Sequence, residues 1–304
     1  MFLYGITNKG ELAQYYYQRC PDFKFNELPP YLCKILTEER LAPIGILDKW
    51  CGSQGITYPI NTLEWEENKI FFYDRQASAL LANYVSVNPE HVTELSSEKV
   101  NLIQTSIKYM AYFFPSQTQI IFEFTSVIVW LKANECGFSG AAFHELPHCT
   151  FLSDAFFIAV TPSAILEPIH RPYIIFENLY HEALHHQLSA SVMLHTKGYY
   201  EPENHNNRFY YIKSRNKSWS IPNILQAAYV YLNVLSTRIS YLQIIIKHNL
   251  PCETIYTSIT QAINYCREMI NVLLQDDMLK QDIQDYISKM DAHLNLLTKE
   301  YKKL

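Results

Sequence analysis

Two histidines spaced four residues apart mark the middle of the chain as a candidate metal site. His181 and His185 flank Glu182 in the run His-Glu-Ala-Leu-His, an HExxH motif. On a helix, residues i and i+4 lie on one face one turn apart, so both imidazoles can reach a single ion. The glutamate between them lies near that ion, where it can act as a base, as a ligand or as a partner that orients a ligand. The motif therefore predicts metal-dependent chemistry.

The residues around the motif favour a helix. No glycine or proline lies between Tyr173 and Lys197, Pro172 suits a first turn, and Gly198 suits a C-terminal cap. We therefore predict one helix over about 172–197. Eight of the eleven histidines fall between residues 144 and 205, which strengthens the metal hypothesis. The alternative is that the two histidines line the polar edge of a buried helix and bind no metal.

A second match to the motif lies nearby, at His144-Glu145-Leu146-Pro147-His148. Pro147 would remove a helix hydrogen bond and clash with the preceding turn, and the flanking residues suit a loop. We predict a polar surface turn here. The alternative is that His144 or His148 supplies a further ligand or touches the substrate.

The third metal ligand is harder to assign. Leu188 and Ser191 stand where a metzincin would carry glycine and histidine. A gluzincin requires a glutamate on the following helix, but the next predicted helix, 222–247, contains no Asp or Glu. Near the start of that helix the one strongly polar inward-facing residue is Gln226. Further possible ligands lie in the intervening loop, which reads more naturally as a solvated turn: Glu201, Glu203 and His205. The peptidase interpretation is weakened, and the third donor stays open.

The elements that must position these residues are mostly helical. The fold class we predict is mainly α with a small β-sheet (α+β), in which the long HExxH helix packs against the following core helix. The chain is taken as a single domain over 1–304, with an N-terminal helical portion, 1–115, and a metal-site portion, 116–304, as the alternative division. Besides 172–197, hydrophobic periodicity predicts helices over 10–40 (short), 74–114 with a break at Pro89, from Pro222 onward, 252–275 and 277–303. Strands are predicted at Gln119–Phe124, Val127–Trp130 and Ala155–Val160, and a polar loop over Tyr199–Ser220.

Composition excludes several classes of protein. Hydrophobic residues make up 48% and charged residues 18% of the 304, enough apolar material for a large core. The formal charge of −5 gives no basic field for nucleic acid. Seven scattered cysteines without a CxxC pair argue against a disulfide framework or a zinc ribbon. No apolar run is long enough for a membrane span, and the start lacks a signal peptide, so we expect a cytoplasmic protein with neither a membrane nor a nucleic-acid partner.

A longer stretch of sequence carries a resemblance to a known family. The run Tyr180-His-Glu-Ala-Leu-His-His-Gln-Leu188, then Ser214-Arg-Asn216, then Ile224-Leu-Gln-Ala-Ala-Tyr-Val230 resembles the HExxH-type peptide-modification family. Those proteins are iron- and 2-oxoglutarate-dependent peptide β-hydroxylases of ribosomal natural-product pathways. The match covers about residues 170–235. The resemblance implies Fe(II), 2-oxoglutarate and O2 as cofactors and a ribosomally made precursor peptide as substrate.

The resemblance also implies roles for individual residues. His181 and His185 would bind the iron, with Gln226 as third ligand and Glu182 or a donor elsewhere in the chain as alternatives. Arg215 would hold the distal carboxylate of 2-oxoglutarate, with Arg171 and Arg208 as weaker competitors. Glu182 is the candidate catalytic residue, and Tyr180 and Tyr229 are the candidate substrate-binding residues.

The chain departs from the family pattern just before the second helix. Trp219 stands where many members carry an arginine, and Asn216 and Lys217 stand where acidic residues are common. The loop therefore departs from the family in the residues that would contact substrate and cosubstrate, whereas the HExxH motif is intact. Two other functions stay open: a zinc metallopeptidase with Glu182 as general base, and a degenerate protein that binds a peptide without metal.

Overall fold

The computed structural model describes residues 61–73, 75–132, 140–143, 148–162, 164–191 and 208–304. They group into two compact units. The sheet unit contains the described residues from 61 to 158 together with Arg171–Ala190. The helical unit contains Ala159–His170 and residues 208–304. The prediction of short helices over 10–40 lies outside the described residues.

The sheet unit is built on a five-stranded mixed sheet in the order β1-β2-β3-β5-β4. β1 (Asn61–Trp65) and β2 (Asn68–Phe72) form an antiparallel hairpin, and β2 continues in parallel to β3 (Val127–Leu131). β3 pairs in parallel with β5 (Cys149–Ser153), and β4 (Gly140–Ala142) closes the sheet antiparallel to β5. Every residue of β3 and β5 is buried, as expected for central strands covered on both faces.

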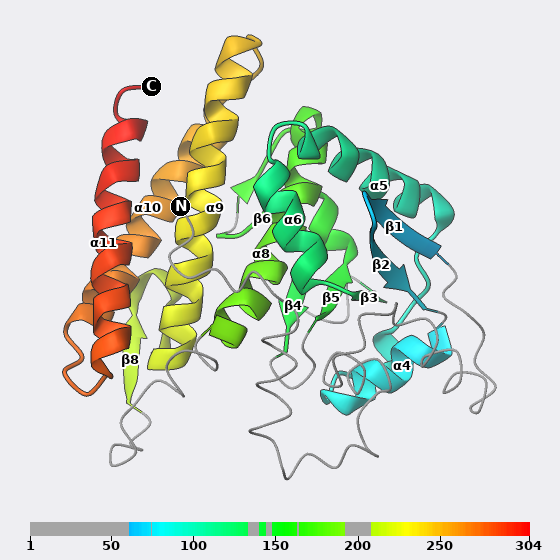
Figure 1. Cartoon of the computed structure of the whole chain (residues 1–304), viewed down its shortest axis with the longest axis horizontal. Helices are drawn as coiled ribbons and strands as arrows, with labels where there is room; N and C mark the ends of the chain where they lie inside the picture. Colours follow the sequence, from blue (N-terminus) through cyan, green and yellow to red (C-terminus); the bar gives the residue numbers. More distant parts are fainter. Residues whose placement is uncertain (1–60, 74, 133–139, 144–147, 163, 192–207) are drawn as a thin grey trace. The chain divides into compact units, whose positions relative to one another are not determined.

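Helices surround this sheet within the same unit: α4 (Arg75–Tyr84), α5 (Ser97–Ala111), α6 (Pro115–Phe124) and α8 (Arg171–Ser191). The hydroxyl of Ser96 caps α5 by accepting a hydrogen bond from the Lys99 amide at 3.4 Å. α5 lies beside the β1–β2 hairpin (Figure 1). The predicted break at Pro89 is confirmed, since a short 3-10 helix, Pro89–His91, separates α4 from α5.

One strand prediction in this unit is wrong. Gln119–Phe124 belongs to α6, whose apolar residues are buried on nearly all sides: Ile120, Ile121, Phe122 and Phe124. A helix buried all round shows the same continuous apolar run as a central strand, so the sequence pattern could not separate the two. Pro115 opens the helix, and the Thr118 hydroxyl donates to the Phe114 carbonyl at 2.9 Å across its first turn. The strand predicted at Val127–Trp130 is confirmed as β3.

Three long helices form the body of the helical unit: α9 (Ile221–Lys247), α10 (Glu253–Leu274) and α11 (Gln281–Tyr301). They pack side by side, drawn in yellow, orange and red in Figure 1. The three helices predicted from Pro222 onward, over 252–275 and over 277–303 are therefore confirmed. α9 is buried over most of its surface and carries the fully buried Arg238, whose guanidinium donates to the carbonyls of Thr161 at 2.7 Å and Ser258 at 3.3 Å.

Two hairpins complete the helical unit and correct two further predictions. β8 (Phe209–Ile212) and β9 (Lys217–Ser220) pair antiparallel where a polar loop was predicted to run to Ser220. β6 (Ala159–Val160) pairs with β7 (Ala164–Ile165), so only the last two residues of the strand predicted at Ala155–Val160 are extended. Asp154–Phe157 before them is a 3-10 helix.

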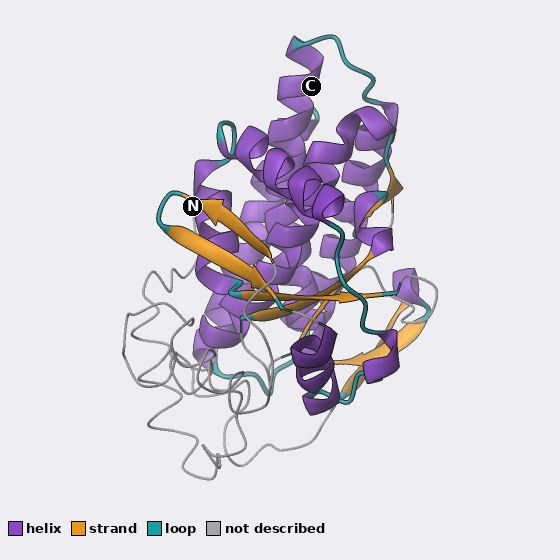
Figure 2. Cartoon of the chain, turned by 90° about the vertical axis from the view of Figure 1, so that its right-hand side faces the viewer, coloured by secondary structure: helices purple, strands orange, loops and turns teal. Residues whose placement is uncertain are grey.

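The described chain is mainly helical with small sheets, as predicted (Figure 2). The packing of the HExxH helix against the next core helix stays a prediction, because α8 and α9 belong to different units. None of the described helices could cross a membrane.

Candidate metal site on α8

The HExxH motif lies in the interior of the sheet unit, on α8. All residues from Tyr173 to Leu188 except His185 are buried. Asn178 donates from its side-chain amide to the Phe156 carbonyl at 2.9 Å, and Phe176 stacks on Phe114 with ring centroids 5.5 Å apart. The helix predicted over 172–197 is confirmed as far as Ser191, and the rest of that range lies outside the described residues. α8 is thus fixed against the sheet unit by both apolar and polar contacts.

His181 and His185 meet on one face of this helix, as the motif predicts. Their Nε2 atoms lie 3.3 Å apart, with His181 buried and His185 half-buried. Two imidazole nitrogens bound to one tetrahedral ion at about 2.0–2.1 Å stand about 3.3–3.4 Å apart. Without metal, the same separation suits a hydrogen bond between one protonated and one bare ring nitrogen. The pair therefore has the spacing that a shared ion requires.

Glu182 points from α8 to the edge of the sheet. Its carboxylate lies against Gly140 of β4, where any β-carbon would collide with the side chain. Oε2 is buried and accepts no hydrogen bond from the described residues. Burial raises the pKa of this carboxyl to about 8. Glu182 is therefore a buried acid with one unused oxygen, immediately next to the histidine pair in sequence.

A second pair of imidazoles lies beside the motif. His186 stacks almost parallel on His148, with ring centroids 6.2 Å apart, and His148 stacks in turn on Phe124 at 5.9 Å. The His186 ring donates to the backbone of Cys149, and burial, reinforced by the neighbouring His185, lowers the pKa of His186 to about 3. His186 is therefore neutral and helps to hold α8 on β5.

His148 corrects the prediction of a polar surface turn at that position. It is buried, with 1% of its surface exposed, and has a left-handed φ of 62°. Its carbonyl accepts from the amides of Ser126 at 2.8 Å and Val127 at 3.1 Å, so the residue also ties the start of β3 to the start of β5. The other residues of the second HExxH match, 144–147, lie outside the described residues. The burial of His148 could have been predicted from the small and apolar residues that follow it in sequence and form β5.

The described residues bring no third acidic, histidine or cysteine ligand to this pair: within them, no three such groups lie close enough to hold an ion. The remaining loop candidates, Glu201, Glu203 and His205, lie outside the described residues. Gln226, the predicted third ligand, is half-buried on α9 in the helical unit. Its approach to the histidine pair therefore stays a prediction.

The two candidate substrate-binding tyrosines are both buried. Tyr180 stacks loosely on Phe176, with ring centroids 6.4 Å apart, in the interior of the sheet unit. Tyr229 lies on α9 at 6.1 Å from the ring of Tyr286, and burial raises the pKa of its hydroxyl above the ordinary range. Each occupies a core position of its own unit, and their predicted contact with a peptide stays untested.

Arg215, the candidate for the carboxylate of 2-oxoglutarate, lies at the turn of the β8–β9 hairpin inside a cage of aromatic rings. Its Cζ is 5.0 Å from the ring centroid of Tyr265, 5.2 Å from Tyr231 and 5.7 Å from Trp219. Burial lowers the pKa of the guanidinium, and no acidic side chain of the described residues pairs with it. Trp219, the departure from the family pattern, is one wall of this cage.

The competing arginines are placed differently. Arg171 is exposed at the first position of α8. Arg208 forms ion pairs with Asp277 at 3.4 Å and, more distantly, with Asp276 at 4.0 Å. Arg208 therefore has anionic partners, whereas Arg215 has no acidic partner among the described residues.

Comparison with protein-family models and with curated proteins found no match to this chain.

Proposed function

We propose that the protein is an Fe(II)- and 2-oxoglutarate-dependent oxygenase that hydroxylates a side-chain carbon of a ribosomally made peptide. The observation that carries the proposal is the 3.3 Å separation of the His181 and His185 Nε2 atoms on a buried helix. Non-haem Fe(II) oxygenases bind iron through two imidazoles and one carboxylate with open positions beside them, and this pair would supply the two imidazoles. The sequence resemblance over about residues 170–235 points to the same chemistry.

Each remaining part of the proposal has a residue assigned to it. His181 and His185 hold the ion, Gln226 completes the protein ligands, and Arg215 receives the distal carboxylate of 2-oxoglutarate. A guanidinium that is caged by rings and lacks an acidic partner among the described residues is suited to bind a carboxylate through two hydrogen bonds. Iron with 2-oxoglutarate and O2 supplies the oxidant, whereas the protein positions the peptide carbon and excludes water.

The test needs no peptide. Metal-free protein is mixed with Fe(II) and then 2-oxoglutarate without oxygen, and the visible charge-transfer band of the chelate is recorded. We expect a band in the wild type that is lost in His181→Ala and in His185→Ala. The matched control is His248→Ala, at an exposed histidine after the end of α9, which should keep the band.

A wild-type protein without the band would contradict the oxygenase proposal. If that protein instead retains zinc and cleaves peptides, the second candidate, a zinc metallopeptidase, is favoured. The observation behind this candidate is the buried Oε2 atom of Glu182, which no described group engages. A bound metal ion nearby would favour the ionised form of this carboxyl, which would then take a proton from a metal-bound water. Cleavage that survives Glu182→Gln would eliminate the peptidase in its turn.

A further inference from the structure

The two edges of the five-stranded sheet differ. β1 forms one edge and β4 forms the other (Figure 1). On β1, the side-chain amide of Gln104 from α5 covers the edge. Its Oε1 accepts from the Glu64 backbone amide at 2.7 Å, and its Nε2 donates to the Glu64 carbonyl at 2.9 Å. Gln104 thus makes the two hydrogen bonds that a further strand would make, so this edge is blocked at Glu64.

β4 has no such cover among the described residues. It pairs with β5 along one side, with Gly140 opposite Leu152 and Ala142 opposite Thr150, and no other described strand pairs with it. Its three residues are half-buried, whereas every residue of β5 is buried. β4 also lacks the proline and the charged side chains with which proteins usually protect an edge. Its second side therefore offers backbone N–H and C=O groups to an added chain.

The open edge lies beside the glutamate of the HExxH motif. A β-carbon at Gly140 would collide with the carboxylate of Glu182, so this position of β4 faces α8. Side chains alternate along a strand, which puts Ala142 on the same face as Gly140 and Ala141 on the opposite face. Since Glu182 directly follows His181 in the chain, the edge runs past the candidate metal site.

We propose that an extended segment of the peptide substrate adds to the open edge of β4 as a further strand, an inference that rests on the proposed function. A strand added here lies about 4.8 Å from β4 and is held by main-chain hydrogen bonds. Its side chains alternate in step with those of β4, so every second one is directed to the side of α8, where Glu182 lies. The residue that reacts belongs to this set.

The chemistry of the edge selects this kind of occupant. β4 offers only backbone donors and acceptors together with side chains no larger than a methyl group, so it presents neither charge nor an aromatic ring for recognition. An extended chain carries the complementary row of backbone groups at the same spacing. A helix does not, because its backbone groups already bond to one another.

The first measurement locates the bound peptide. The probe is a short peptide that alternates threonine and valine, a composition that favours an extended chain, with lysine at both ends and photoreactive benzoylphenylalanine in place of the central valine. The probe is irradiated with the full chain, and the crosslinked residues are identified by mass spectrometry. We expect crosslinks to β4, β5 or α8. Crosslinks confined to other elements would overturn the proposal, as would a complete lack of crosslinking.

The second measurement tests the hydrogen-bond pattern with the wild-type protein. Only every second residue of an added strand turns its N–H toward its neighbour strand, and the residues between turn theirs away. Methylating one backbone nitrogen of the probe at a time should therefore lower the crosslinking yield about tenfold at alternate residues and have little effect at the others. Binding through side chains alone gives no such alternation, so equal yields along the probe would contradict strand addition.

Proline variants test the protein side of the pairing. Ala141→Pro and Ala142→Pro each remove a backbone donor from β4, one on its open side and the other on the side of β5, and both should abolish crosslinking. The matched control is Thr62→Pro on β1. Because Glu64 turns its backbone to Gln104, Thr62 two residues earlier also faces away from β2, and its replacement leaves the pairing of the hairpin intact. β4 variants that crosslink as this control does would refute the assignment to β4.

The outcome is separable from that of the proposed function. His181→Ala should crosslink as the wild type does, because strand addition needs no metal. Crosslinking at β4 in a wild type that lacks the iron band would remove the oxygenase and leave the strand-addition site standing. A band without crosslinking would do the reverse, and light scattering that then shows a dimer would give the edge to a second copy of the chain.

Discussion

Gly140 is the residue whose replacement tests how closely the sheet edge approaches the HExxH glutamate. A β-carbon at this position would collide with Oε1 of Glu182, lie 3.0 Å from its Cδ and lie 3.1 Å from Cδ2 of Leu152. We expect Gly140→Ala to lower the free energy of unfolding by about 1–3 kcal/mol, as overpacking of a buried site does. Urea unfolding of the variant and the wild type gives the difference.

The cause of this loss can be isolated with a second substitution. In a Glu182→Ala background the carboxylate that meets the new methyl group is gone, so Gly140→Ala should cost much less. An equal cost in both backgrounds would show that Leu152 or the backbone, and not Glu182, limits the space.

Individual residues also show where sequence reasoning reached its limit. His181 and His185 could be paired from their spacing alone, because the i and i+4 positions of one helix need no tertiary information. The neighbouring stack of His186 on His148 could not be predicted from spacing, because His148 lies at the start of β5, far from α8 in sequence. Pro147 predicts that this run is not helical, but a proline carries no information about the burial of His148.

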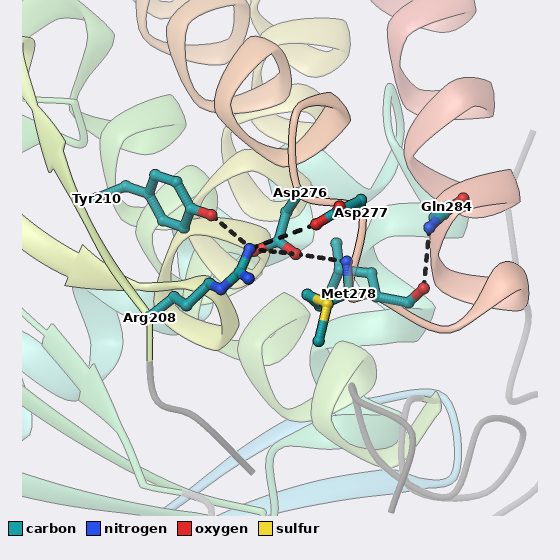
Figure 3. Close-up of polar contacts among 7 residues, drawn as sticks. Arg208, Tyr210, Asp276, Asp277, Met278 and Gln284 are labelled. Atoms are coloured by element: carbon teal, nitrogen blue, oxygen red, sulfur yellow. Dashed lines mark hydrogen bonds and ion pairs between the residues drawn. The ribbon is translucent and has the colours of Figure 1, made fainter. Parts of the chain in front are cut away.

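At the scale of elements, the support of the β8–β9 hairpin depends on one buried carboxylate. Asp276 is 2% exposed, accepts from the Tyr210 hydroxyl and accepts from the Met278 amide at 2.9 Å (Figure 3). Asp276→Ala leaves the half-buried Tyr210 hydroxyl and Met278 amide without this acceptor, so we expect a loss of about 1–3 kcal/mol in the free energy of unfolding. Chemical denaturation measures it.

The neighbouring Asp277 provides the comparison for this prediction. Its side chain is 84% exposed and contacts Arg208 at 3.4 Å. An exposed pair of this kind contributes little, so Asp277→Ala should change stability by less than about 1 kcal/mol. Equal losses in the two variants would mean that Asp276 acts only through its charge on Arg208.

Long helices were easier to predict than strands in this chain. α9, α10 and α11 each have a periodic apolar face over more than five turns, so their extents were predicted from sequence to within a few residues. The β1–β2 and β8–β9 hairpins have strands of four or five residues, too short for a period to show. The parallel pairing of β3 with β5 is set by tertiary contacts that no local pattern carries.

At the scale of the whole molecule, one histidine should make stability depend on pH. Nδ1 of His170 lies 2.9 Å from the Tyr241 hydroxyl, and Nε2 lies 3.5 Å from the Glu167 carboxylate. Burial lowers the pKa of His170 more than Glu167 raises it. The His170 imidazole is therefore protonated near the ordinary pKa of 6.5 in the unfolded chain, but only at lower pH in the folded protein.

The sign of the effect follows from this order of protonation. Above about pH 7, His170 is neutral in both the folded and the unfolded protein, so it adds no pH dependence to the free energy of unfolding. As the pH drops through 6.5 toward the lowered pKa of His170 in the folded protein, the free energy of unfolding falls. His170→Gln should show a shallower decline than the wild type when urea unfolding is compared at about pH 7.5 and 5.5. Identical declines would assign the acid sensitivity to other groups, of which the buried His186 is the first candidate.

The division into two units has a consequence for how the protein is made. The β6–β7 hairpin of the helical unit interrupts the sheet unit in chain order, so α8 is synthesised after a segment that belongs elsewhere. All five strands of the sheet precede α8 in the chain and are synthesised before it. The strands therefore emerge from the ribosome before the helix that carries the histidine pair and that belongs to the same unit. Translation order places the strands of the sheet unit before the two histidines of the motif.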